Sequence, residues 1–187
     1  MKYAALLVVA FGAILVALAA GLRPDAFFVG DPGIKLLAAK NAIARPDQPL
    51  DIPLPIIGPV RLPYVEPFFE VHADHAHAVT TELFPLVSAH FIRWWGLRGA
   101  YVLPALGFLG TLVGCAWLAV ALDRRRNPAL VVLIAALGTP FLFYGLEFWE
   151  HAPAVALAVN ATAMFITAIR GHRVRALWAL GAGIAFG

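Results

Sequence analysis

Charged residues in this chain are confined to a few narrow bands, and the uncharged intervals between them constrain the fold most strongly. Asp, Glu, Lys and Arg are absent from 3–22, 99–122, 127–146, 152–169 and 176–187. A helix needs about 20 apolar residues to cross the hydrocarbon core of a bilayer. Because backbone polar groups in lipid must satisfy one another, such runs are expected to be helices. The sequence therefore predicts an all-α polytopic membrane protein with about four to five transmembrane helices and one large outer loop.

The overall composition excludes an ordinary soluble domain, because the mean hydropathy is +0.82 and 61% of the residues are hydrophobic. The sequence pI of about 9.4 does not indicate nucleic-acid binding, because the basic excess lies at two span ends. These clusters are Arg124, Arg125 and Arg126, and Arg170, Arg173 and Arg175. Lys and Arg mark the cytoplasmic ends of spans. We therefore expect a multi-pass protein of the cell (inner) membrane with a cytoplasmic N-terminus and residues 23–98 outside.

The apolar segments at the two ends of the chain differ from the central spans. Residues 3–22 follow Lys2 and could be a signal peptide, but their length exceeds the ~7–15 residues of a signal-peptide core and favours an uncleaved first span. Residues 176–187 are too short to cross a bilayer and form an incomplete span. We expect 1–187 to be a single membrane domain that is a fragment of a longer chain.

The outer loop carries eight of the eleven acidic residues, so we expect any chemistry to lie there. Its first part predicts a short helix over 32–44, with Asp31 as the N-cap and Pro32 in the first turn. The following part, 46–79, has too many prolines for a helix and predicts extended chain.

Short strands are expected within this extended part, over 64–71 and 76–79, as a hairpin that turns near Asp74. The rest of the loop, 81–95, predicts a helix with Leu83, Val87, Phe91 and Trp94 at helical spacing. This apolar stripe fits either an interfacial helix on the bilayer surface or packing against the protein's own membrane helices.

Two groups of polar residues are candidates for chemistry. Asp31 follows the first span and can act either as a helix cap or as a general base at the membrane surface. Glu147, Glu150 and His151 would share one face of a helix, where they could bind a divalent ion or a polar head group, or simply form a solvated turn.

A third group, His72, Asp74, His75 and His77, contains zinc-ligand types. Strand alternation would place His75 and His77 on the opposite face from His72 and Asp74, and no second ligand set follows. We therefore assign no metal site to the chain from its sequence. The spans contain almost no ionisable side chains, which argues against a proton-coupled transporter.

Three stretches together resemble a known family. They are Gly-Asp-Pro-Gly-Ile-Lys at 30–35, the segment from Leu83 to Pro104, and Gly-Thr-Pro-Phe-Leu-Phe-Tyr-Gly-Leu-Glu-Phe-Trp-Glu-His at 138–151. With an acidic residue just outside the first span and a long outer loop, the chain resembles the N-terminal part of GT-C membrane glycosyltransferases. The nearest group is similar to the bacterial dolichyl- or polyprenyl-phosphate-mannose-dependent mannosyltransferases.

This resemblance implies transfer of a sugar from a lipid-linked phosphate donor to an acceptor at the outer membrane face, with inversion at the anomeric carbon. By resemblance, Asp31 is the catalytic carboxylate. Lys35, Arg61 and His151 are candidates to contact the lipid phosphate, and Glu147 and Glu150 to contact substrate. No cofactor is certain, although a divalent cation remains open. The alternatives are a non-enzymatic membrane assembly or scaffold protein and, less favoured, a lipid or solute transporter.

Overall fold

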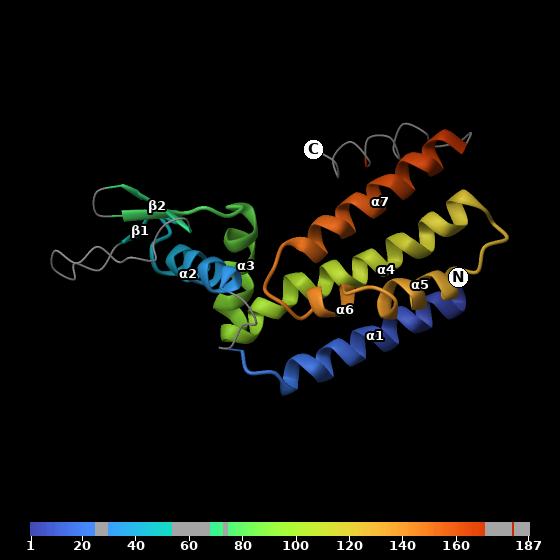
Figure 1. Ribbon diagram of the computed structural model, residues 1–187, viewed down its shortest axis with the longest axis horizontal. Helices are drawn as coiled ribbons and strands as arrows, with labels where there is room; N and C mark the ends of the chain where they lie inside the picture. Colours follow the sequence, from blue (N-terminus) through green and yellow to red (C-terminus); the bar gives the residue numbers. More distant parts are fainter. Residues whose placement is uncertain (25–29, 54–67, 73–74, 171–180, 182–187) are drawn as a thin grey trace. The chain divides into compact units, whose positions relative to one another are not determined.

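The computed structural model describes residues 1–24, 30–53, 68–72, 75–170 and 181 (Figure 1). Contacts between residues divide the chain into two compact units. The first, which we call the helical unit, comprises Met1–Leu22 and Leu103–Gly187. The second, which we call the loop unit, is Arg23–Val102 and corresponds closely to the outer loop expected from the charge pattern.

Three helical stretches of the described residues are long and apolar enough to cross a membrane. They are α1 (Lys2–Gly21), the stretch Leu83–Leu122, which ends in α4 (Val102–Leu122), and α7 (His151–Arg170). The chain is therefore mostly helical and suited to a membrane, as its sequence predicts. The expected count of four to five spans is not confirmed.

The expected span 127–146 differs from the structure, because it is not one helix. It consists of α5 (Pro128–Leu137) and the short α6 (Phe141–Tyr144), separated by Gly138, Thr139 and Pro140. Proline disfavours helical backbone in the residue before it and lacks the N–H that a helix requires. At about 1.5 Å per residue, α5 covers only half of the ~30 Å hydrocarbon core.

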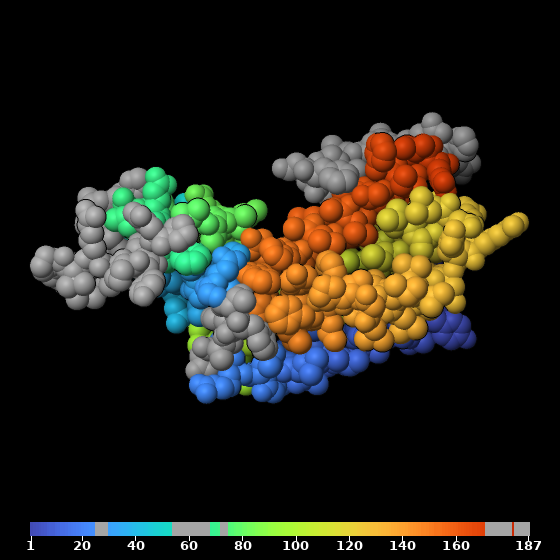
Figure 2. All heavy atoms as spheres, viewed as in Figure 1, coloured from blue at the N-terminus to red at the C-terminus, as the bar shows by residue number. Residues whose placement is uncertain are grey.

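The core of the helical unit lies where α4 meets α1 and α5. Phe11 of α1 meets Phe108 of α4 edge to face, with ring centroids 6.2 Å apart. Val132 and Ala136 of α5 are buried in the same cluster. Figure 2 shows the side chains of α5 and α6 lying along α1.

The opposite side of α4 contacts α7 through glycines. A Cβ at Gly107 would overlap the backbone of Pro153, and one at Gly114 would lie 2.8 Å from Asn160 Nδ2. Asn160 donates from Nδ2 to the carbonyl of Gly110, at 2.9 Å. Gly107, Gly110 and Gly114 thus form a small-residue face of α4, which the close approach of two helices requires.

The loop unit contains α2 (Asp31–Ala44), β1 (Ile52–Pro53), β2 (Phe69–His72), β3 (His75–Ala78) and α3 (Leu83–Trp95). The three strands form an antiparallel sheet in the order β1-β3-β2. Helix α2 packs against α3. The helices expected over 32–44 and 81–95 and the hairpin are confirmed, whereas 64–67 and 73–74 lie outside the described residues.

A sharp bend follows α3. Gly96 adopts a φ of 61°, in the left-handed region that favours glycine, and the 3₁₀ helix Gly96–Tyr101 begins there. A Cβ at Gly99 would overlap the backbone of Phe91, so glycine is required for this close approach. The Tyr101 hydroxyl donates to the carbonyl of Arg23, at 3.2 Å, and ties the two ends of the loop unit together.

Candidate functional site

Asp31 is the first residue of α2. The N-cap position is occupied by Gly30, and the Asp31 carboxylate does not bond to the helix N-terminus. The expected capping role is therefore wrong, because Asp31 lies one position inside the helix. Its carboxylate instead contacts Lys35, one turn further along, while its position in the first turn still favours the negative charge.

Lys35 explains why this contact forms. Its side chain is only 2% exposed, and its Nζ lies 2.5 Å from Asp31 Oδ2. A buried ammonium is strongly unfavourable without a compensating charge. Because Asp31 supplies such a charge while its own side chain stays 37% exposed, the pair presents an oriented carboxylate to solvent. Lys35 was expected to contact substrate, and the structure places its ammonium beside Asp31.

Glu147, Glu150 and His151 do not share a helical face. Glu147 and Glu150 lie in the turn that follows α6, and only His151 belongs to α7, as its first residue. The expectation of a common face is wrong, because the helix ends at Tyr144 and the intervening turn changes the direction of the chain. Glu147 is buried, at 2% exposure, whereas His151 is exposed.

Aromatic rings surround this turn. The Trp149 ring lies 4.9 Å from the His151 ring and 5.8 Å from the Tyr144 ring, measured between centroids. The Tyr144 and His151 rings meet edge to face at 5.4 Å. Stacking of this kind fixes the orientation of an otherwise exposed imidazole.

These residues fall in different units. Asp31 and Lys35 belong to the loop unit, whereas Glu147, Glu150 and His151 belong to the helical unit. Arg61, the remaining candidate, lies outside the described residues.

Helix α3 exposes a band of large apolar side chains. Leu83, Val87, Trp94 and Trp95 are exposed, and Phe91 stacks on Trp95 with ring centroids 6.1 Å apart. The buried face of the helix carries Phe84, Ala89 and Ile92 instead. The stripe seen in the sequence is therefore the outward face of α3.

One arrangement in the loop unit was not predicted from the sequence. Asp51, just before β1, offers a ligand atom that lies within 4.8 Å of ligand atoms of both His75 and His77. The shared face of His75 and His77 follows from strand alternation. Asp51 could not be found in this way, because its contact depends on the pairing of β1 with β3 across more than 20 intervening residues.

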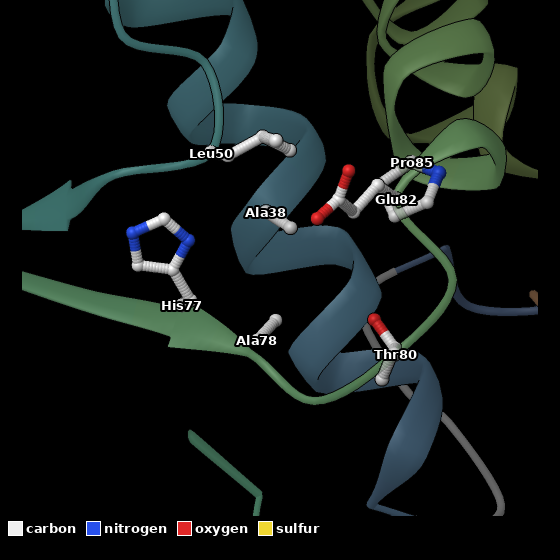
Figure 3. A pocket seen from close by; sticks show the side chains of 7 residues that line it. All are labelled: Ala38, Leu50, His77, Ala78, Thr80, Glu82 and Pro85. Atoms are coloured by element: carbon white, nitrogen blue, oxygen red, sulfur yellow. The ribbon is translucent and has the colours of Figure 1, made fainter. Parts of the chain in front are cut away.

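Two hollows border this arrangement. One, with about 20 Å³ of free volume, admits about one water molecule. Figure 3 shows its lining side chains, which come from α2, from the chain just before β1, from β3 and from the segment that leads into and begins α3. The other is larger, at about 340 Å³, and is lined by Arg45, Gln48, Asp51, Pro53 and His75.

No protein-family model, curated protein or solved structure matches this chain.

Proposed function

We propose that this chain is the N-terminal module of an integral membrane glycosyltransferase that takes its sugar from a polyprenyl-phosphate donor. The proposal rests on the position and the surroundings of the Asp31 carboxylate. This carboxylate begins the first helix after α1, is oriented by Lys35 and remains open to solvent. An acid at this position is the feature that also carries the family resemblance.

The proposed reaction gives Asp31 one task. An acceptor hydroxyl attacks the anomeric carbon of the donor sugar, and the bond between that carbon and the phosphate oxygen breaks. Asp31 accepts the proton that the hydroxyl loses, and the lipid phosphate leaves with the bonding electron pair. A positioned general base of this kind contributes about 10²–10⁴-fold to a rate.

Lys35 is proposed to position Asp31. An ammonium that is buried beside the carboxylate fixes the direction in which its free oxygen points. Exposed His151 is proposed to contact the lipid phosphate, and the family resemblance implies the same role for Arg61. Glu150 is proposed to contact substrate. Buried Glu147 is proposed to support the turn that carries Glu150 and leads into His151.

The proposed site of glycosyl transfer lies at the outer face of a bacterial inner membrane. A lipid-linked donor is met at the interface, and tryptophans favour that layer. The exposed Trp94 and Trp95 would place α3 at the interface, with the loop unit outside and the N-terminus inside. This arrangement favours the bilayer-surface alternative for the α3 stripe.

The test compares Asp31→Asn with Asp47→Asn in membranes that contain the protein. Asp47 is an exposed aspartate in the same unit, which makes it a matched control. We expect Asp31→Asn to reduce transfer of radiolabelled sugar from a polyprenyl-phosphate donor by about 100-fold or more, and Asp47→Asn to leave it unchanged. Equal transfer by both variants would exclude Asp31 as the base. Absence of transfer from unaltered membranes would favour the assembly-protein alternative.

A further inference from the structure

We propose that Asp51, His75 and His77 bind a divalent transition-metal ion, with Zn²⁺ as the best fit. The site belongs to the loop unit and shares no residue with the site proposed for glycosyl transfer. One ligand atom from each residue lies within 4.8 Å of the other two. Two imidazoles and one carboxylate match zinc sites with three protein ligands and an open fourth position. Imidazole ligands disfavour Mg²⁺ and Ca²⁺, which prefer oxygen.

The backbone register builds this arrangement. Ile52 of β1 pairs with Ala76 of β3, and Pro53 pairs with His75. Antiparallel pairing continued by one residue sets Asp51 opposite His77. Directly opposed residues have Cβ atoms about 4.5–5.5 Å apart, and residues two apart on a strand share one face. All three side chains are therefore brought together by two short strands.

The distances between the side chains of Asp51, His75 and His77 are such that a small movement of these side chains would admit a metal ion. His77 Nε2 lies 2.8 Å from Asp51 Oδ1, and the His75 and His77 rings have centroids 5.6 Å apart. With metal–ligand distances of about 2.0–2.2 Å, ligand atoms around a tetrahedral ion lie about 3.4 Å apart. Asp51 and His77 would thus separate by about half an ångström to admit the ion, which side-chain rotation can supply.

The position of Asp51 is fixed by the end of α2. Asn41, which is buried, donates from Nδ2 to the carbonyls of Gln48, Pro49 and Asp51, at 3.2, 2.9 and 3.2 Å. Arg45 Nη1 donates to the same Asp51 carbonyl at 2.9 Å. These bonds hold the segment that carries Asp51 against α2. Pre-organised supporting groups of this kind raise metal affinity.

The site is accessible to solvent and has room for a further ligand. The side chains of His77 and Asp51 are 37% and 34% exposed. Asp51 and His75 also line the larger hollow, of about 340 Å³, so an ion between them would border it. A water molecule or a small anion in that hollow would complete the coordination, and Arg45 at its edge favours an anion.

The experiment is calorimetric titration of the full chain in detergent with ZnCl₂ alone, using protein purified without a histidine tag. We expect one saturable equivalent, with affinity reduced at least about tenfold in each of Asp51→Asn, His75→Ala and His77→Ala. The controls are Asp47→Asn and His90→Ala, because both residues are exposed and lie outside the site. Both controls should bind as the unaltered protein does.

A second measurement does not depend on the folding of the variants. Co²⁺ added to the unaltered chain should give the intense visible absorption of four- or five-coordinate cobalt, and Zn²⁺ should abolish it. Absence of saturable Zn²⁺ binding, or unchanged binding in all three ligand variants, would overturn the proposal. The contact between Asp51 and His77 would then be a cross-strand hydrogen bond only.

Discussion

At the scale of single residues, the ion pair of Asp31 and Lys35 links the burial of the lysine to the orientation of the carboxylate that is proposed to react. Lys35 is buried and pairs with a carboxylate, and Asp31 gains a fixed orientation from the same contact. Removal of one member of such a pair takes a compensating charge away from the other. The two residues should therefore be treated as one functional element.

Replacement of Lys35 distinguishes positioning of Asp31 from direct binding of the donor. We expect Lys35→Met to lower kcat for glycosyl transfer by about tenfold or more with little change in the donor KM, because the orientation of Asp31 is lost while the groups that bind the donor remain. Lys40→Met is the control, because Lys40 is an exposed lysine of the same helix. A raised KM with an unchanged kcat would show instead that Lys35 contacts the lipid phosphate.

The sequence identified Asp31 but assigned it the wrong local contact. The Gly-Asp-Pro order is compatible with either Gly30 or Asp31 as the N-cap. The ion pair of Asp31 with Lys35 could not be predicted either, because it depends on the burial of Lys35, which the sequence does not show. Asp51 was not identified because strand pairing over a long sequence separation leaves no local pattern. The role of Asn41, a buried amide that holds three carbonyls, was missed for the same reason.

At the scale of secondary structure, α4 is bounded by α1 and α5 on one side and by α7 on the other. Its glycines allow α7 to approach, and the Arg170 guanidinium donates to the carbonyl of Ala121 near the end of α4, at 2.6 Å. Carbonyls at a helix C-terminus have no partner within the helix, so this contact stabilises both helices.

Two glycine substitutions test this packing. A Cβ at Gly107 would overlap the backbone of Pro153, whereas one at Gly12 would meet only the side chain of Leu109, at 3.6 Å. We expect Gly107→Ala to lower the free energy of unfolding by about 1–3 kcal/mol. Gly12→Ala should be neutral or slightly stabilising, because alanine is the better helix former. Unfolding in mixed micelles, followed by circular dichroism, gives both values, and equal effects would contradict the packing.

Helix ends in the loop unit could be predicted to within two residues, because Asp31 and Pro32 mark the start of α2 and apolar residues at helical spacing mark α3. The span 127–146 could not be predicted correctly from its apolar content. Hydropathy counts Gly138, Thr139 and Pro140 as compatible with a span, although together they end α5. Thr139 Oγ1 donates to the carbonyl of Ala135, at 2.6 Å, and so satisfies one carbonyl at that end.

At the scale of the whole molecule, the chain combines a helical unit suited to a membrane with a loop unit that carries most of its acidic residues. The charge pattern predicts that the loop unit lies outside and that the turn at Arg124 lies inside. These two segments are therefore expected on opposite sides of the membrane.

Cysteine labelling in intact cells tests this topology. Cysteines introduced at Asp47 and at Arg124, both exposed residues, are compared in a Cys115→Ala background. We expect a membrane-impermeant maleimide to label Asp47→Cys in intact cells and Arg124→Cys only after the membrane is opened. Labelling of Arg124→Cys in intact cells would contradict the predicted topology. It would show that the turn at Arg124 lies outside, which implies that Asp31 lies on the cytoplasmic side.

The catalytic role of Asp31 is tested by measuring donor binding and sugar transfer in the same nanodisc preparation of Asp31→Asn. A photoreactive polyprenyl-phosphate sugar reports binding, and a single-turnover assay reports transfer. If Asp31 is the base, the variant should bind the donor as the unaltered protein does and transfer the sugar at least about 100-fold more slowly. Transfer at the unaltered rate by a variant that binds the donor normally would contradict the catalytic role of Asp31.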